Sequence, residues 1–258
     1  MQPVISTVIV EDEPLSRLYL GSLLAESCPD ISVAGSAQSE SEAVSLINEL
    51  QPSLVFLDIE LQTGTGFGVV SRLPLFRGHI IFTTALDEHA TNILRLAGVP
   101  FIEKPIDGES LAAAVNSVRN AACASHHSNA LAQLHETLSN GNVPRTIFVG
   151  GQGEAEYIPL QDIVAIESTG GECLLKLSSG SMVSADYPLK QLELMLAEFG
   201  FFRSHMHHII NRRHVHNGAS IRDEQLYMSN GLLVPVSPKK EAALRSYLAS
   251  EGAVRNAK

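Results

Sequence analysis

The first 120 residues alternate between short apolar runs and longer segments whose apolar residues recur at helical spacing. Five runs have the length and composition of buried strands: Thr7–Val10, Ile31–Ser36, Leu54–Asp58, His79–Thr83 and Val99–Ile102. Four segments have helical periodicity: Pro14–Glu26, Ser39–Leu50, Asp87–Leu96 and Asp107–Arg119. Strands that alternate with helices pair in parallel, because each helix carries the chain back across the sheet. We therefore predict an α/β domain with a doubly wound, parallel five-stranded sheet.

Charged residues follow three of these strands at the point where each strand ends. The acidic run Glu11-Asp12-Glu13 follows the first strand, Asp58 closes the third, and Lys104 follows the fifth. Because open α/β sheets bind ligands at the carboxyl edge of their strands, we expect these side chains to converge there. Carboxylates crowded beside one ammonium group repel one another unless a divalent cation lies among them. The pattern predicts a Mg²⁺ site beside Asp58, a carboxylate that can accept a phosphoryl group.

Several of these residues also have an ordinary structural interpretation. Glu11 and Glu13 are nearly as well explained as solvated loop acids, so Asp12 is the preferred metal ligand. Phe101 fits core packing at a strand end, and Thr84 would serve as a helix N-cap. Asp58 is different, because a carboxylate that ends a buried strand is costly unless it has a function.

This set of residues resembles the receiver domain of two-component response regulators, which has a flavodoxin-like fold. The matching residues occur in order, each at the end of an expected strand or in the loop after it: Glu11-Asp12-Glu13, Asp58, Gly66, Thr84-Ala85, Phe101 and Lys104-Pro105. The resemblance implies that a sensor histidine kinase transfers a phosphoryl group to Asp58. It also implies a protein that is not an enzyme, apart from its own phosphoryl transfer and dephosphorylation.

The resemblance implies a role for each residue of the site. Asp12, Asp58 and the backbone carbonyl of Glu60 would hold Mg²⁺, with Glu11 acting on it mainly through water. Lys104 would pair with the phosphoryl group as a point charge.

Three further features of the site follow from the resemblance. Thr84 would hydrogen-bond the phosphoryl group after moving inward, and the ring of Phe101 would turn inward with it. Lys104-Pro105 resembles the cis peptide that aims the lysine at the site. The loop Leu61–Gly66 departs from the family, because it lacks a proline that is often found there. We expect this loop to be more pliable.

Residues 121–143 differ in composition from the segments on either side, with Ala, Ser, His, Asn and Gly predominating. Ala130–Leu138 has the spacing of a short helix. We expect a linker over 123–143 that belongs to neither core, between a first domain at 1–122 and a second at 144–250.

The second half of the chain has the pattern of a mostly-β domain. Eight short runs are candidate strands: Thr146–Val149, Glu156–Pro159, Ile163–Glu167, Cys173–Leu177, Met182–Ala185, His208–Ile210, Gln225–Ser229 and Leu232–Val236. Pairs that contain glycine, such as Gly170-Gly171 and Asn230-Gly231, separate several of them as turns. Only Leu189–Phe199 and Pro238–Ala249 have helical spacing.

This half resembles the LytTR DNA-binding domain over about residues 145–248. The resemblance rests on five segments: Tyr157–Leu160, Ile163–Ser168, Phe201–His205, Ile209–Asn211 and Val234–Lys239. That family binds DNA with loops that project from a β-fold. The whole chain therefore looks like a LytTR-type response regulator. Phosphorylation would favour a homodimer that binds double-stranded DNA and regulates transcription.

Six residues are the predicted DNA contacts: Arg203, His205, Asn211, Arg213, Lys239 and Glu172. The amide of Asn211 has the donor and acceptor needed to read adenine. Contacts from Arg203, His205 and Arg213 to phosphate would fix the register without reading sequence. Glu172 departs from the family, because a carboxylate is repelled by phosphate; it would instead accept a hydrogen bond from cytosine.

The charge distribution agrees with a regulator joined to an anion binder. The net charge of −10 lies in residues 1–139, which hold 6 Lys and Arg against 16 Asp and Glu. Residues 203–216 hold three arginines, five histidines and no acid. A solvated face explains the charge alone equally well.

The histidines His205, His207 and His208 admit three interpretations. A zinc site lacks an evident third ligand and orienting carboxylate, and side chains on a strand alternate between faces. A pH-sensitive DNA contact fits better, because histidine changes charge in the physiological range. His208 would also fill an aromatic core position.

Two other functions remain open: a receiver-controlled metal-dependent hydrolase on the histidine-rich domain, and a protein-binding output without DNA contact. No apolar run approaches the ~20 residues that span a bilayer, and no secretory signal is evident at the N-terminus. The three cysteines lie far apart, without metal-ligand spacing. We expect a cytoplasmic protein that does not enter a membrane.

Overall fold

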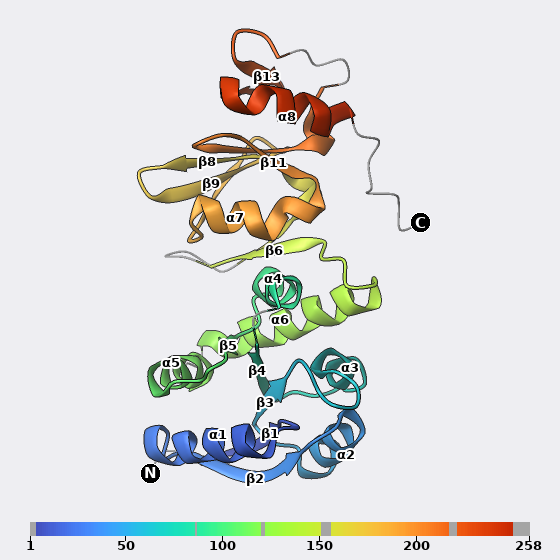
Figure 1. Cartoon of the computed structure of the whole chain (residues 1–258), viewed down its shortest axis with the longest axis vertical. Helices are drawn as coiled ribbons and strands as arrows, with labels where there is room; N and C mark the ends of the chain where they lie inside the picture. Colours follow the sequence, from blue (N-terminus) through green and yellow to red (C-terminus); the bar gives the residue numbers. More distant parts are fainter. Residues whose placement is uncertain (1–3, 86, 120–121, 151–155, 217–220, 250–258) are drawn as a thin grey trace. The chain divides into compact units, whose positions relative to one another are not determined.

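The computed structural model describes residues 4–85, 87–119, 122–150, 156–216 and 221–249 (Figure 1). The chain divides into two compact units, Met1–Pro144 and Arg145–Lys258, which we describe separately. The first unit contains β1 Ile5–Val10, α1 Pro14–Ser27, β2 Ile31–Ala37, α2 Glu40–Leu50, β3 Leu54–Asp58, α3 Gly66–Ser71, β4 His79–Thr84, α4 Glu88–Ala97, β5 Phe101–Glu103, α5 Gly108–Arg119 and α6 Ala122–Ser139.

The first unit has the predicted doubly wound sheet. Its five strands are all parallel, in the order β2-β1-β3-β4-β5. The prediction missed α3, because its glycine-rich sequence has low helix propensity. The helix begins where the Thr65 hydroxyl accepts a hydrogen bond from Gly68 N at 2.9 Å. The last strand also begins later than expected, at Phe101 rather than Val99.

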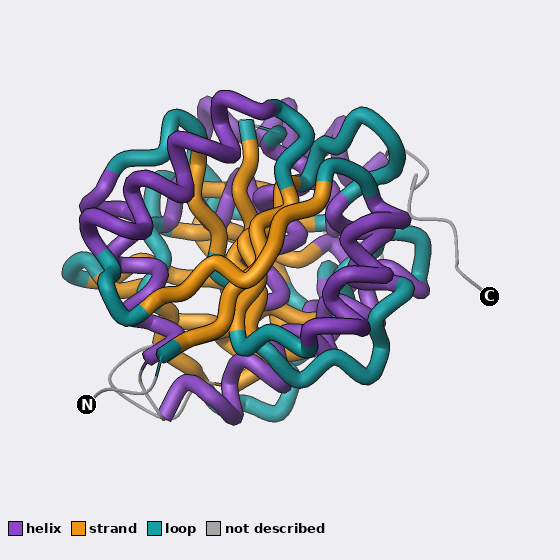
Figure 2. Tube along the Cα trace, turned by 90° about the horizontal axis from the view of Figure 1, so that it is seen from below, coloured by secondary structure: helices purple, strands orange, loops and turns teal. Residues whose placement is uncertain are grey.

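Helices cover both faces of this sheet (Figures 1 and 2). The strands bury side chains on each face in turn. In β3, Val55 and Leu57 pack against α2, α3 and α4, whereas Leu54 and Phe56 pack against α1 and α5. A strand buried on both faces reads as a continuous apolar run, which is why this strand was evident from sequence.

Helix α6 corrects the expectation of a linker over 123–143. Ala130, Leu131 and Leu134 are buried in the core that α2, α3 and α4 share with the sheet, and Leu138 packs against it. The helix lies beside α4 (Figure 1). Its apolar residues at positions 130, 131, 134 and 138 form one face at helical spacing, and the receiver supplies the surface that buries this face.

The second unit is mostly β, as predicted. Its elements are β6 Thr146–Val149, β7 Glu156–Pro159, η1 Leu160–Asp162, β8 Ile163–Thr169, β9 Glu172–Leu177, β10 Met182–Ala185, α7 Leu189–Leu196, η2 Ala197–Phe199, β11 Phe201–His205, β12 His208–Asn211, η3 Arg212–His214, β13 Gln225–Tyr227, β14 Leu233–Pro235 and α8 Pro238–Ala249.

An antiparallel sheet in the order β10-β9-β8-β12-β11 forms the centre of this unit. Two hairpins, β6-β7 and β13-β14, are separate from it. One core joins β8 and β12 to β13, β14 and Leu244 of α8. Strand β11 was not among the predicted strands, because Arg203, Ser204 and His205 interrupt its apolar pattern.

The burial of α6 leads to a stability prediction. Leu134 is fully buried, so we expect Leu134→Ala to lower the free energy of unfolding of the first unit by about 2–4 kcal/mol, the usual cost of such a cavity. Denaturant unfolding followed by circular dichroism measures the change. The exposed Glu136 on the same helix gives the control Glu136→Ala, with little change expected. Equal stabilities of the two variants would show that α6 does not pack on the core in solution.

Candidate functional site

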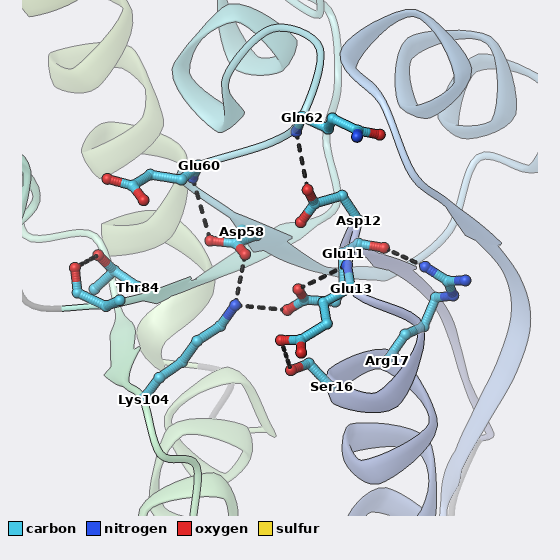
Figure 3. A network of polar contacts seen from close by, with 11 residues as sticks. Glu11, Asp12, Glu13, Ser16, Arg17, Asp58, Glu60, Gln62, Thr84 and Lys104 are labelled. Carbon is cyan, nitrogen blue, oxygen red and sulfur yellow. Dashed lines mark hydrogen bonds and ion pairs between the residues drawn. The ribbon is translucent and has the colours of Figure 1, made fainter.

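The predicted acidic residues and the lysine meet at the carboxyl edge of the parallel sheet (Figure 3). Glu11 and Asp12 follow β1, Asp58 is the last residue of β3, and Lys104 follows β5. They line one open pocket together with Glu13, Glu60, Leu61, Gln62 and Ala85. The convergence expected from the strand pattern is confirmed.

Lys104 links two of the carboxylates. Its Nζ donates to Asp58 Oδ2 at 2.5 Å and lies 2.8 Å from Glu11 Oε2. The side chains of Glu11 and Asp58 are only 3% and 6% exposed, so neither charge is well solvated. Glu11 is therefore not a solvated loop acid. By contrast, Glu13 is exposed and accepts a hydrogen bond from Ser16 Oγ at 2.7 Å.

Burial and the neighbouring charges change the pKa values of Glu11 and Lys104. Burial raises the pKa of Glu11, the hydrogen bond from Lys104 opposes this rise, and the charge of Asp58 adds to it. Burial alone would lower the pKa of Lys104, but its contacts with Asp58 and Glu11 raise it overall. The lysine thus stays charged, while a second cation would relieve the carboxylates.

Carboxylate oxygens of Glu11, Asp12 and Asp58 lie within 4.8 Å of one another. Among the residues that the structure describes, no other group of three or more His, Cys, Asp or Glu side chains has its ligand atoms this close together. A donor set made only of oxygen suits a hard divalent cation such as Mg²⁺. The residues present fit the ion that the sequence predicts. Glu60 lines the same pocket, and the role of its carbonyl oxygen remains a prediction.

The loop after Asp58 is tied to the carboxylates through its backbone. Glu60 N donates to Asp58 Oδ1 at 3.2 Å, and Gln62 N donates to Asp12 Oδ2 at 3.0 Å. A side chain at Gly66 would overlap the backbone carbonyl of Asp58, which explains the glycine at this position. No sequence pattern indicated the Gln62 contact, because a backbone donor can belong to almost any residue type.

The remaining receiver residues lie in or directly after β4 and β5, the two strands that lead to Ala85 and Lys104 of the pocket. Thr84 is buried at the end of β4, where its hydroxyl lies 3.4 Å from the carbonyl of Ala85. Phe101 is half-buried against the core, and the Arg95 guanidinium lies 4.9 Å from its ring centre. The Lys104–Pro105 peptide is cis, as the resemblance implies. The movements of Thr84 and Phe101 remain predictions.

Asn211 is a correction to the predicted DNA contacts. The residue is 1% exposed, and its Nδ2 donates to the carbonyls of Leu160 and Ile163 at 3.1 and 2.8 Å. Its Oδ1 accepts a hydrogen bond from Arg213 N at 3.0 Å. Every polar atom of the amide is thus used inside the domain, and none is left to read a base. Asn211 holds η1 and η3 against β12 instead.

Several other predicted DNA residues gather at one end of the second unit's sheet. We call this end the sheet tip: His205, Met206, His207 and His208 at the β11–β12 turn, and Gly170, Gly171 and Glu172 at the β8–β9 turn. Ser168 N donates to His207 O at 2.9 Å and so joins the two turns. Lys239 lies in the first turn of α8, beside β11, because Ser237 N donates to Ser204 O at 2.9 Å.

Two arginines behave differently from expectation. Arg203 pairs with Glu193 at 2.7 Å and donates to the carbonyls of His205 and Met206, so it fixes the β11–β12 turn. Arg213 is exposed but follows β12, whereas the sheet tip precedes that strand. The structure therefore does not bring Arg213 and His205 together.

The histidines of the sheet tip have an acidic neighbour that the sequence did not reveal. His208 Nε2 lies 3.5 Å from Glu167 Oε1, and Glu167 also pairs with Lys176 at 2.5 Å. Burial lowers the pKa of His208, although the charge of Glu167 opposes this. The rings of His207 and His208 each lie within 6 Å of His205, but the three do not form a metal-ligand group among the described residues.

Two protein-family models match the chain. The response regulator receiver domain matches residues 7–116, and the LytTr DNA-binding domain matches residues 153–249. These two domains define a response regulator that acts on DNA.

Relatives share this arrangement along most of the chain. The transcriptional regulatory protein BtsR of Escherichia coli (strain K12) is 26% identical over 249 residues, which cover 94% of this chain and 98% of that protein. The positive alginate biosynthesis regulatory protein of Pseudomonas aeruginosa is 29% identical, covering 93% and 97%. This chain belongs to the LytTR-type response regulators, which are transcription regulators rather than enzymes.

Solved structures are similar to parts of the chain. A DNA-binding response regulator from Staphylococcus aureus covers 45% of this chain and 99% of its own, with 24% identity and a TM-score of 0.41. A LytTr DNA-binding domain from Bacillus cereus covers 42% and 99%, with 20% identity and a TM-score of 0.37. None of the described helices has the length and apolar character needed to cross a bilayer.

The raised pKa of Glu11 leads to a prediction of pH-dependent stability. A carboxyl whose pKa is raised by folding favours the folded state below its unfolded pKa, and this contribution is lost as the pH rises through the folded value. Without Mg²⁺, we expect Glu11→Gln to raise the melting temperature at pH 7 by about 2–4 °C. The gain should disappear as the pH falls toward 4.5, the ordinary value for glutamate. Calorimetry checks both; a gain that grows on acidification would contradict the charge balance described above.

The burial of Asn211 leads to a second prediction. Asn211→Ala leaves the carbonyls of Leu160 and Ile163 without their donor, so we expect a loss of about 1–3 kcal/mol in stability. Selection of bound sequences from a random DNA pool should return the same motif for the variant and the wild type. A changed preference at one base position would restore Asn211 as a base-reading residue.

Proposed function

We propose that a sensor histidine kinase phosphorylates Asp58 and that this event controls DNA binding and dimerisation by the chain. In the transfer, one oxygen of Asp58 forms a bond to phosphorus while the bond between phosphorus and the kinase's histidine breaks. Bound Mg²⁺ would neutralise negative charge that develops between the carboxylates and the phosphoryl group. Asp12 and Asp58 would hold the ion, with Glu60 contributing its carbonyl oxygen.

The observation that carries this proposal is the shared position of Lys104. Its ammonium lies at the pocket, within 2.8 Å of both buried carboxylates. Phosphorylation of Asp58 would give Lys104 a more highly charged partner without moving the lysine from its strand end. Phosphoryl transfer depends mainly on such positioning and on charge neutralisation.

Thr84 supplies the connection from the pocket to the rest of the domain. It ends β4, next to Ala85 in the pocket lining, and α4 begins four residues later. Movement of the Thr84 hydroxyl toward the phosphoryl group would pull on the chain that leads into α4. A modification shifts a conformational equilibrium only through contacts that differ between the two states, and this hydroxyl offers such a contact.

For DNA, we propose that the sheet tip and Lys239 are the contacting surface. Met206, His207 and Glu172 are exposed there, on turns that project from the sheet. The backbone of the β11–β12 turn is held by Arg203, so it can meet DNA with little loss of freedom. Lys239 is exposed in the first turn of α8, beside β11, and suits a phosphate contact.

The proposal is tested by loading the chain with a small-molecule phosphodonor in the presence of Mg²⁺. We expect wild type to gain one acyl phosphate, to sediment as a dimer and to bind promoter DNA at least tenfold more tightly. Asp58→Ala should do none of these. Intact-protein mass spectrometry, analytical ultracentrifugation and titration with labelled DNA give the three readouts.

Glu13→Ala is the matched control, because it removes an acid of the same pocket rim whose side chain bonds Ser16 instead of Lys104. It should be phosphorylated like the wild type. Phosphate retained by Asp58→Ala at an equal level would refute Asp58 as the acceptor. If the phosphorylated chain still sediments as a monomer and binds DNA no more tightly, phosphorylation does not control dimerisation or DNA binding.

A further inference from the structure

Glu40, the first residue of α2, reaches the loop that follows the proposed phosphoacceptor. Its Oε2 accepts a hydrogen bond from Thr65 N at 3.1 Å, and its own backbone N donates to Thr63 O at 3.1 Å. Its Oε1 lies 3.5 Å from the Arg72 guanidinium. The side chain is 23% exposed and so largely enclosed by the loop and α3.

Two glycines make room for this carboxylate. Gly64 has a φ of +87°, a conformation that other residues rarely adopt. A Cβ at Gly64 or at Gly68 would overlap the side chain of Glu40. The loop therefore has close steric contact with Glu40 as well as two hydrogen bonds to it. The missing proline does not leave the loop without support.

The other side of the same loop faces the acidic pocket. Gln62 N donates to Asp12 Oδ2, and Glu60 N donates to Asp58 Oδ1. Glu60 and Thr65 also form an isolated antiparallel bridge, so a shift of Thr65 is transmitted to Glu60. The loop thus connects Glu40 on one side to Asp12 and Asp58 on the other.

We propose that Glu40 is a positioning residue for the phosphoacceptor site. Its carboxylate holds the loop 60–65 so that the Glu60 and Gln62 backbones fix the metal-binding carboxylates. The proposal rests on the proposed function of Asp58. Groups that hydrogen-bond a metal ligand change the affinity for the metal by roughly 10- to 100-fold when they are removed. Glu40 lies one step further out, behind Thr65, so we expect an effect at the lower end of this range. Glu40 performs this role without touching the ion or the phosphoryl group.

The test measures Mn²⁺ affinity by electron paramagnetic resonance and, separately, the rate of phosphorylation by a small phosphodonor. We expect Glu40→Ala to weaken Mn²⁺ binding by about tenfold and to slow phosphorylation at low Mg²⁺ by a similar factor. Glu40→Gln keeps an acceptor for Thr65 N and should stay within about threefold of wild type. If Glu40 positions the loop, its hydrogen-bond acceptor matters, and only Glu40→Ala is impaired. If Glu40 acts only through its charge, Glu40→Ala and Glu40→Gln are impaired alike.

Two controls separate this role from others. Glu49→Ala removes an exposed carboxylate from the same helix and should change neither readout. Arg72→Ala should also have little effect, because exposed ion pairs are weak. Wild-type Mn²⁺ affinity in Glu40→Ala, with an unchanged melting temperature, would overturn the proposal. If the wild type binds Mn²⁺ but is not phosphorylated, only the role of Asp58 as phosphoacceptor is refuted. The Mn²⁺ affinities of the wild type and Glu40→Ala would still decide the role of Glu40.

Discussion

The contact of one ammonium group with two buried carboxylates is the interaction on which the receiver site depends. Lys104 reaches Glu11 and Asp58 from a third strand, and Asp12 adds a further carboxylate with no cation of its own among the described residues. The strand order brings these residues together, and burial makes their repulsion costly. Burial, and to a smaller extent the charge of Asp58, raises the pKa of Glu11. The pocket is thus suited to a second cation and to a phosphoryl group that Lys104 can then pair with.

Hydrogen bonds on both sides hold the loop that follows Asp58. Glu60 N and Gln62 N donate to Asp58 and Asp12, and Glu40 holds the loop from its far side. Helix α6 extends the first unit by packing where a linker was expected. It lies against α4, the helix that follows Thr84. The end of the first unit is thus packed against the helix that follows the pocket.

Features that depend on residues near one another in the sequence could be predicted from it. The apolar run before Asp58 fixed both the strand and the carboxylate at its end, and parallel pairing then placed Asp12 and Lys104 beside it. The predictions failed where the outcome depends on tertiary partners. The sequence predicts Asn211 as a DNA contact, but carbonyls some fifty residues earlier in the chain accept hydrogen bonds from its amide. Likewise, the apolar face of α6 was visible, whereas the surface that buries it was not.

Binding of beryllofluoride, which imitates a phosphoryl group on aspartate, tests the central claim most directly. Mg²⁺ and the anionic beryllofluoride bring opposite charges to the same pocket, so each must strengthen the binding of the other. Isothermal titration of the full chain should therefore show one beryllofluoride bound per chain with Mg²⁺ present and very weak binding without it. Equal affinity in both conditions would contradict the account, because the pocket would then need no second cation to accept the group.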